Sequence, residues 1–357
     1  MQIIIVSPSL DTTKNVSGVS SVTKFIIENN PHHNYVHFEL GRRDGEKGGL
    51  YRICSIIRKF KEWKRLLKKY PNAIVHYNFP LEKPSIIRDT PFMHAALKNG
   101  NKMVIHVHGG VFLTSESIPF PFRQILKHVF SWEVPFIMLS ENETRTLQNK
   151  FHAKYVISLP NCIDLTDAKA YERKNKDASS PLTLGYLGRI AKTKGMDYLL
   201  EACSILKERN IPFLLKLAGA EDIKGQYLPQ FSKMLGNQFE YSGVVSGESK
   251  KFFLQSLDLL VMPTFFEGLP MSLLECMSYG VVPVITPVGS ISTVVTDHQN
   301  GIYIKVKDTD SIVKAIAYMH TTRNKLELMS MSSCDYIFKH FDPDTYINRL
   351  NNIYINC

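Results

Sequence analysis

Short apolar runs alternate with amphipathic stretches along this chain of 357 residues. The runs at residues 2–7 and 103–108 are almost continuously apolar, which is typical of strands buried on both faces of a parallel sheet. In the first half, the pattern predicts strands at residues 2–7, 35–40, 73–77, 103–108 and 136–139, and helices at residues 19–28, 51–70 and 141–150. This alternation predicts an α/β domain whose sheet is covered by helices on both faces.

The alternation stops near residue 163 and restarts near residue 182. The intervening segment, residues 163–181, is rich in Lys, Glu, Asn and Ser from Ala168 onward and is typical of a linker. Beyond it, the pattern predicts strands at residues 182–187, 213–218, 239–242, 257–262 and 281–285, and helices at residues 196–209, 248–256, 310–318, 325–340 and 343–357. The sequence therefore predicts a first domain over residues 1–162 and a second α/β domain over residues 182–342.

Composition and charge separate the two halves. The chain is 44% hydrophobic and 21% charged, as in soluble globular proteins, and its six cysteines form no CxxC pair. This cysteine usage indicates reduced thiols in a cytoplasm. Residues 1–160 carry 22 Lys and Arg against 12 Asp and Glu, whereas the remainder carries 21 of each. The excess positive charge predicts an anionic partner for the first half alone.

Candidate binding groups stand where predicted strands end, which is where open α/β sheets bind ligands. With two such sheets, we expect the ligand in a cleft between them. Gly18 precedes the first predicted helix and would let backbone N–H groups approach a phosphate, although a lone glycine more often serves a turn. His108 ends a strand before Gly109 and Gly110 and is a candidate ligand contact, whereas His106 is better explained as a core histidine.

A basic segment follows the strand at residues 182–187. It reads Gly-Arg-Ile-Ala-Lys-Thr-Lys-Gly from residue 188 and places Arg189 and Lys194 between two glycines. A guanidinium and an ammonium at a strand end suit phosphate oxygens, although a solvated basic loop is the simpler alternative. Neither a GxxxxGK[ST] loop nor a GxGxxG motif after a strand is present, so phosphates would depend on this pair and on helix N-termini.

Two glutamates follow the apolar run at residues 257–262. Glu267 lies in a predicted loop, and Glu275 lies eight positions later in a segment that turns helical after Pro270. Such carboxylates can accept hydrogen bonds from ligand hydroxyls while the helix N-terminus binds an anion. Taken alone, they could equally be an ordinary loop glutamate and an ordinary helix glutamate.

Together these motifs carry a family resemblance. The segment Pro-Thr-Phe-Phe-Glu-Gly-Leu-Pro-Met-Ser-Leu-Leu-Glu at residues 263–275, preceded by Arg189 and Lys194, resembles the retaining glycosyltransferases of family four. The resemblance extends over almost the whole chain, through Gly18, Pro160-Asn161, Gly219 and the last helix. It implies the GT-B fold, with two Rossmann-like domains facing across a cleft and the helix at residues 343–357 crossing back to the first domain. The sequence departs from the family at Cys162, where glycine is usual, and beside Gly18, which lacks a second glycine.

The resemblance also implies a role for each residue. Glu275 would bind the ribose hydroxyls of a nucleoside-diphosphate sugar, and Glu267 would face the hydroxyls of the transferred sugar. Arg189 and Lys194 would neutralise the diphosphate, and His108 would contact the donor sugar. The remaining implied donor-binding positions are Gly18, Gly219, Val244, Gly268, Leu269, Pro270 and Met271.

The implied reaction moves a sugar, with retention, from a UDP-sugar, or a GDP-sugar as second choice, to a saccharide acceptor. The expected acceptor is lipid-linked and belongs to surface polysaccharide synthesis, such as O-antigen, lipopolysaccharide, capsule or exopolysaccharide; a soluble small-molecule or protein acceptor is the alternative. In the family, front-face attack is favoured over a nucleophilic carboxylate. Because cationic side chains do the neutralising, no metal or other cofactor is expected.

The acceptor side of such enzymes is the first domain, which here holds a basic helix. Residues 51–70 contain eight Lys or Arg and one Glu, with an apolar stripe that includes Trp63. This helix could contact an anionic membrane at the inner face of the plasma membrane, or its stripe could cover the sheet while its basic face is solvated. A nucleic-acid-binding protein or a non-catalytic sugar-binding subunit are rivals from other classes. We expect no nucleic-acid partner, because that would leave Glu267 and Glu275 without a purpose.

Overall fold

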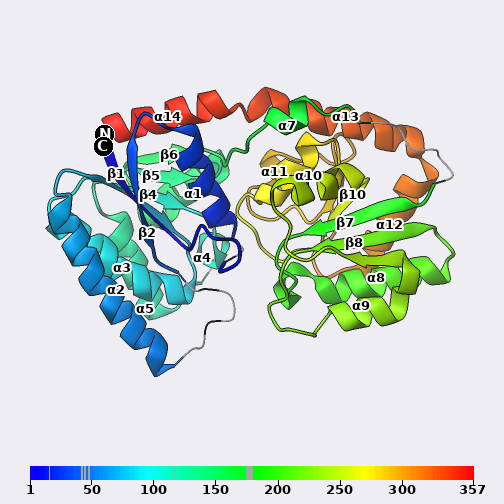
Figure 1. Cartoon of the computed structure of the whole chain (residues 1–357), viewed down its shortest axis with the longest axis horizontal. Helices are drawn as coiled ribbons and strands as arrows, with labels where there is room; N and C mark the ends of the chain where they lie inside the picture. The colour runs from blue at the N-terminus through cyan, green and yellow to red at the C-terminus, as the bar shows by residue number, and fades with distance from the viewer. Residues whose placement is uncertain (16, 42, 44–45, 47–48, 116, 174–179) are drawn as a thin grey trace. The chain divides into compact units, whose positions relative to one another are not determined.

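The computed structural model describes residues 1–15, 17–41, 43, 46, 49–115, 117–173 and 180–357. The chain divides into two compact units, shown in Figure 1. The first consists of Met1–Cys162 together with Pro343–Cys357, and the second consists of Ile163–Asp342. Of the segment predicted as a linker, residues 174–179 lie outside the described residues.

The first unit is built on a six-stranded parallel sheet. Its strands are β1 (Gln2–Ser7), β2 (Asn34–Glu39), β3 (Ile74–Phe79), β4 (Met103–Val107), β5 (Phe136–Met138) and β6 (Val156–Ser158), in the order β2-β1-β3-β4-β5-β6. Ile3, Ile4 and Ile5 of β1 are fully buried, although successive side chains point to opposite faces. Both faces are therefore covered, as the continuous apolar runs predict.

Helices cover this sheet on both faces (Figure 1). They are α1 (Gly18–Asn29), α2 (Leu50–Lys69), α3 (Lys83–Lys98), α4 (Val111–Thr114), α5 (Phe120–Phe130), α6 (Glu141–Phe151) and α14 (Pro343–Ile355). Helices α2, α3 and α5 bury Trp63, Phe92 and Phe130 in one core with alternate side chains of β3 and β4. The other side chains of these strands face α1 and α14, and they include the polar residues His76 and His106.

Helix α14 packs on the first unit although it ends the chain. Tyr346 stacks edge-on against Phe25 of α1 with 5.6 Å between ring centroids. The Tyr354 hydroxyl lies 2.7 Å from His76 Nδ1, and Arg349 donates to the carbonyl of Ser158 at 2.6 Å. These contacts tie the last helix to α1, β3 and β6.

The second unit has a similar parallel sheet. Its strands are β7 (Leu182–Leu187), β8 (Phe213–Ala218), β9 (Phe239–Tyr241), β10 (Leu259–Met262), β11 (Val282–Ile285) and β12 (Ile302–Tyr303), in the order β12-β11-β10-β7-β8-β9. The α-helices are α7 (Thr166–Lys169), α8 (Met196–Glu208), α9 (Leu228–Leu235), α10 (Gly247–Ser256), α11 (Met271–Ser278), α12 (Thr309–Thr321) and α13 (Arg323–His340). Short 3-10 turns span Lys192–Lys194, Gly236–Gln238 and Ile291–Thr293. The predicted α/β class with two Rossmann-like parallel sheets is confirmed.

None of the helices in the described part of the chain is both long and apolar enough to cross a bilayer.

Candidate functional site

The strand order of the second sheet reverses between β7 and β10. From β7 the chain passes through α8 to β8 on one side, and β10 pairs with β7 on the other side. The loops that leave β7 and β10 therefore lie next to each other at the carboxyl edge of the sheet, and the chain runs on from them in opposite directions. This reversal is the point where open α/β sheets bind ligands. Arg189 and Lys194 lie in or next to the first loop, and Glu267 lies in the second. The fold thus brings together three candidates that are far apart in sequence.

Lys194 and Glu267 form an ion pair across these two loops. Lys194 Nζ lies 2.5 Å from Glu267 Oε1, and both side chains are largely buried. The hydroxyl of the fully buried Thr264 shares its single proton between the same carboxylate oxygen and the Phe266 carbonyl, each 3.1 Å away. Two donors therefore fix Glu267, while its second oxygen can accept further hydrogen bonds.

Glu275 has a partner that the sequence patterns did not reveal. It lies on α11, and its Oε1 is 2.8 Å from Nζ of Lys250 on α10. The carboxylate is mostly buried and the ammonium about one third exposed. No spacing rule links these two residues, because α10 and α11 are separated by β10. The pair holds the carboxylate in one place while leaving hydrogen-bond acceptors for another donor.

Arg189 is held through its backbone and faces an acid. The hydroxyl of the buried Tyr186 donates to the Arg189 carbonyl at 2.7 Å. Burial raises the pKa of Tyr186 far above its usual value, and the charge of Glu267 raises it further. The phenol therefore stays protonated as a donor. Arg189 Nη1 lies 3.8 Å from the exposed carboxylate of Asp222, a contact that solvent screens.

Close backbone approaches set the shape of this edge. Gly219 follows β8 with φ at +135°, and a Cβ there would lie 1.8 Å from the Gly188 carbonyl oxygen. Gly195 has φ at +76°, and a Cβ there would lie 2.0 Å from the carbonyl oxygen of Pro263. Only glycine fits either position, because of both the left-handed backbone and the contact. Predicted site residue Gly219 thus shapes the edge through its backbone.

The other predicted donor-binding positions surround the start of α11. Pro270 precedes the helix, which begins without a side-chain cap, so its first N–H groups carry the partial positive charge of the helix terminus. The side chains of Leu269 and Met271 are buried, and Gly268 accepts from Ser290 N at 3.0 Å through its carbonyl. Gly268, Leu269 and Met271 can therefore reach a ligand only through their backbone, and Pro270 has no N–H to donate. Val244 follows β9 and is 43% exposed.

In the first unit, Gly18 is the first residue of α1. A Cβ at Gly18 would have no atom within 4 Å, and the helix has no side-chain cap at Ser17. The loop that leads to it is ordered by Asp11, which accepts from Thr13 N at 3.0 Å and pairs with Lys14 at 2.9 Å. Of this glycine loop, residue 16 lies outside the described residues. The packing of the first unit therefore gives no steric reason for glycine at residue 18.

His108 lies immediately beyond β4, because the strand ends at Val107, one residue earlier than predicted. Its Nε2 is 2.5 Å from Oδ1 of Asn78 on β3, and its ring is 4.1 Å from that of His106. Burial lowers the pKa of His108 to about 3, so the ring is neutral. His106 is fully buried, as expected for a core histidine, yet neither ring nitrogen has a hydrogen-bond partner.

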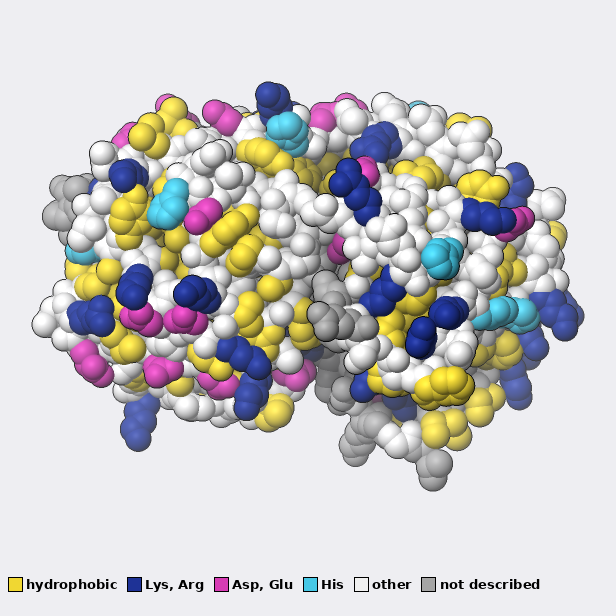
Figure 2. Space-filling view, turned by 180° about the vertical axis from the view of Figure 1, so that it is seen from behind, with side chains coloured by type: hydrophobic (Ala, Val, Ile, Leu, Met, Phe, Trp, Pro, Cys, Tyr) yellow, Lys and Arg dark blue, Asp and Glu magenta, His cyan; other side chains and the backbone are white. Residues whose placement is uncertain are grey.

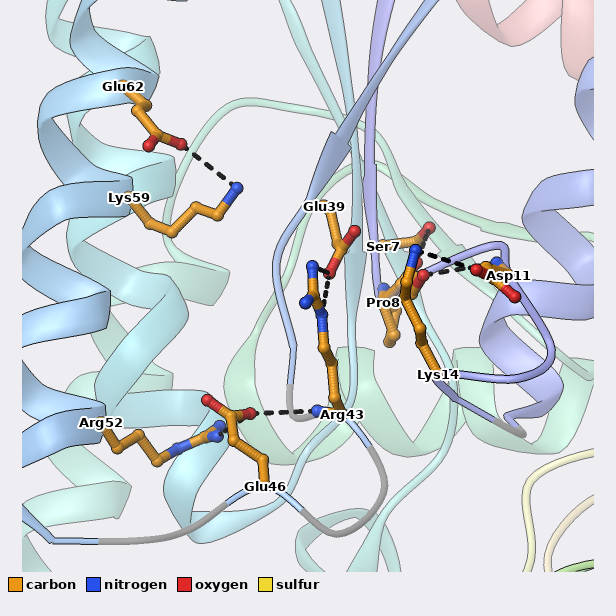
Figure 3. A network of polar contacts seen from close by, with 11 residues as sticks. Ser7, Pro8, Asp11, Lys14, Glu39, Arg43, Glu46, Arg52, Lys59 and Glu62 are labelled. Carbon is orange, nitrogen blue, oxygen red and sulfur yellow. Dashed lines mark hydrogen bonds and ion pairs between the residues drawn. The ribbon is translucent and has the colours of Figure 1, made fainter.

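Ion pairs line the ends of β1 and β2 in the first unit (Figure 3). Arg43 pairs with Glu39 at 2.7 Å, and Arg52 pairs with Glu46 at 2.9 Å. Lys59 of α2 pairs with Glu62 on the same helix at 3.2 Å. Each of these cations already faces a carboxylate, so the basic excess of this unit must be sought elsewhere on its surface. Within the described residues, no group of three or more His, Cys, Asp or Glu could hold a metal ion.

Comparison with known proteins bears on the second unit first. Residues 167–332 match the family model described as Glycosyl transferases group 1. A relative from Escherichia coli, UDP-Gal:alpha-D-GlcNAc-diphosphoundecaprenol alpha-1,3-galactosyltransferase, is 24% identical over 341 residues, covering 85% of this chain and 82% of that protein. With other curated relatives the match is shorter, and the chain spans about half of their length, 43% and 50% in two cases.

Solved structures resemble the chain over its whole length. Sucrose-phosphate synthase from Thermosynechococcus elongatus has a TM-score of 0.79 at 16% identity and covers 99% of this chain and 98% of its own. Anabaena HepE in complex with UDP-glucose has a TM-score of 0.75 at 12% identity, with both chains fully covered. At such identities the likeness establishes the fold, which is the GT-B class that the sequence predicts.

Proposed function

We propose, from the match of residues 167–332 to the family model of the glycosyl transferases group 1, that the protein transfers a sugar from a nucleoside-diphosphate sugar to a saccharide acceptor with retention. The observation that carries this proposal is the pairing of Lys194 with Glu267 and of Lys250 with Glu275 around the switch point of the second sheet. Cations beside carboxylates suit a ligand with both phosphates and hydroxyls. A UDP-sugar is the donor we favour over a GDP-sugar, because HepE was solved with UDP-glucose.

In the proposed complex, Glu275 accepts hydrogen bonds from the ribose and Glu267 from the transferred sugar. Arg189 and Lys194 meet the charge that develops on the diphosphate as the glycosidic bond breaks, and the N–H groups at the start of α11 add to this. The leaving phosphate accepts the proton of the attacking hydroxyl. These side chains need no metal or cofactor to neutralise the leaving group in this scheme.

The test is donor binding and turnover in Glu275→Ala. We expect isothermal titration to detect UDP binding by the wild type and a loss of at least tenfold in the variant, since a charge-assisted hydrogen bond to the ribose is removed. Glu240→Ala is the matched control, because Glu240 also pairs with a lysine, Lys216 at 3.0 Å, but lies on β9 and is exposed. Equal UDP affinity in Glu275→Ala and wild type would refute the site. The same titration with GDP and ADP ranks the bases.

We propose in addition that the acceptor is lipid-linked and is reached at the cytoplasmic face of a membrane through α2. Trp63 and Leu67 are buried in the core, so the second half of the apolar stripe covers the domain. In the first half Ile56 also packs partly against the core, but Tyr51, Ile53 and Ile57 are 53–66% exposed. Exposed apolar side chains on a basic helix suit an anionic bilayer surface. On the visible face of the first unit, Lys and Arg have few acidic neighbours, whereas on the second unit both signs mix (Figure 2).

Vesicle flotation tests this second proposal. We expect the wild type to float with phosphatidylglycerol vesicles at low salt, and the double variant Ile53→Ser/Ile57→Ser to float several-fold less. The control is Leu328→Ser/Met331→Ser on α13, which removes two side chains of similar exposure from the second unit, 63% and 59%. If the wild type does not float, or if both double variants float equally well, the membrane contact is wrong and a soluble acceptor is favoured.

A further inference from the structure

A directional chain of hydrogen bonds runs through the first unit and ends at His108. It begins in α1, where the Thr23 hydroxyl donates to the carbonyl of Val19 at 2.8 Å. Having donated its proton, this hydroxyl oxygen can only accept from its next neighbour, which is Nδ2 of Asn78 at 3.2 Å. Thr23 is fully buried, so water does not compete for these positions.

Asn78 is oriented by two acceptors. Its Nδ2 also donates to the carbonyl oxygen of Val6 at 2.8 Å, and a backbone carbonyl has no proton to offer. Both amide protons of Asn78 are therefore used toward Val6 and Thr23. Its Oδ1 is left to face His108 Nε2 at 2.5 Å, and an amide oxygen can only accept. The side chain is 4% exposed, so this orientation is enforced by burial.

The tautomer of His108 follows from this order. A neutral imidazole carries its proton on one nitrogen only, and the hydrogen bond made by one nitrogen decides which. The proton must lie on Nε2, because Oδ1 of Asn78 has none to give. Nδ1 then holds a lone pair. The ring of His106, 4.1 Å away at an angle of 32°, supports the plane of the His108 ring from one side.

We propose that Asn78 is a positioning residue that fixes His108 as the Nε2–H tautomer, which leaves Nδ1 as an acceptor for a hydroxyl group of a sugar substrate. This inference rests on the proposed function for its ligand, but the tautomer itself is a property of the first unit alone. A sugar hydroxyl is the partner of matching chemistry, because it donates readily, whereas a phosphate oxygen at neutral pH would be repelled by the lone pair. In this tautomer the histidine therefore favours a hydroxyl group over a phosphate.

The first test reads the tautomer directly. In protein labelled with ¹⁵N-histidine, long-range proton–nitrogen correlation separates protonated from unprotonated ring nitrogens, and the His108 signals are assigned by their loss in His108→Gln. We expect a protonated Nε2 and an unprotonated Nδ1 in the wild type at pH 7. Asn78→Leu should give a mixture of both tautomers. A wild-type spectrum with a protonated Nδ1, or an unchanged spectrum in Asn78→Leu, would overturn the proposal.

The second test separates positioning from a merely structural effect. We expect Asn78→Leu to lower kcat about tenfold, the value of one hydrogen bond, while the affinity for UDP without its sugar stays the same. Asn78→Asp keeps an acceptor toward Nε2 but adds a negative charge, which favours the imidazolium; the acid limb of its pH–kcat profile should move to higher pH. Asn101→Leu is the control, since Asn101 is equally buried, at 4% exposure, and donates to three backbone carbonyls far from His108 in the fold.

The outcomes distinguish this inference from the proposed function. If the wild type transfers no sugar from any donor, the proposed function fails and the sugar contact fails with it, while the spectra still decide the tautomer. If the wild type is active and Asn78→Leu loses no more activity than Asn101→Leu, the positioning role is wrong and the proposed function stands.

Discussion

At the scale of single residues, glycines determine how the loops of the second unit meet. Gly195 after β7 touches the backbone of Pro263 after β10, and Gly289 after β11 would place a Cβ 2.0 Å from the Glu267 carbonyl oxygen. Each contact joins the loop that carries Lys194 or Glu267 to a neighbouring loop. The 2.5 Å pairing of Lys194 with Glu267 therefore depends on backbone fit beside it as much as on charge.

Gly195→Ala should damage the site more than the fold. The added Cβ would meet the Pro263 carbonyl oxygen at 2.0 Å, so the loop that carries Glu267 must shift. A misplacement of about 1 Å can cost about 100-fold in rate, and we expect a loss of that order in sugar transfer. Gly225→Ala is the matched control, because Gly225 has nearly the same φ, +78°, with nothing within 4 Å of the added atom. It should lose only about 1–2 kcal/mol of stability from the left-handed backbone. Equal activity of the two variants would contradict the argument.

At the scale of elements, the sequence predicted those whose pattern is local. Strands such as β1 and β7 were predicted with their observed ends, because each is a short, largely apolar segment that ends just before a proline or a glycine. Helix α3 was missed because Pro91 inside it argues against a helix, whereas Pro84 lies in the first turn, where proline is tolerated. Phe92 and Met93 are nevertheless buried against the core. Tertiary packing there outweighs local propensity.

The candidate site was predictable in its parts but not in its pairings. Lys194 and Glu267 are 73 positions apart, and Glu275 and Lys250 lie on different helices, so only the strand order of the sheet brings them together. The role of Asn78 could not be predicted from the sequence, because an asparagine inside an apolar strand gives no indication of its hydrogen-bond partner. Strand order depends on long-range pairing, which periodicity does not encode.

Helix α2 combines two environments along one stripe, and mutations should separate them. Trp63 is fully buried, donates from Nε1 to the carbonyl of Phe92 at 2.9 Å and lies 4.8 Å from the Phe38 ring. Trp63→Ala should destabilise the protein by about 3–5 kcal/mol, the usual cost of such a cavity. Ile57→Ala, at a position 53% exposed on the same helix, should cost within about 0.5 kcal/mol. Chemical denaturation followed by circular dichroism measures both; similar losses would show that the whole stripe covers the core.

At the scale of the molecule, the first unit holds basic groups that stay neutral. His76 and His108 have their pKa lowered to about 3 by burial, and burial lowers the pKa of His106 well below its ordinary value of 6.5. In the unfolded chain these rings bind protons below about pH 6.5. The free energy of unfolding is therefore unaffected by these rings above about pH 6.5. As the pH falls from there toward 3, each ring lowers the free energy of unfolding by about 1.4 kcal/mol per pH unit.

Replacing His106 should flatten this dependence. The ring has no hydrogen-bond partner on either nitrogen, so His106→Leu removes a buried base at no cost in hydrogen bonds and should leave stability at pH 7 equal or higher. Between pH 6 and 5, the variant should lose about 1.4 kcal/mol less than the wild type, because one fewer proton is taken up on unfolding.

Both tryptophans, Trp63 and Trp132, lie in the first unit, so urea unfolding followed by tryptophan fluorescence reports on this unit. His32→Leu, at an exposed position of the same unit, is the control and should keep the wild-type slope. Because each variant is compared with the wild type at the same pH, groups such as the buried Asp89, whose pKa burial raises, cancel. Identical slopes for His106→Leu and wild type would contradict the argument, because His106 would then take up no proton on unfolding.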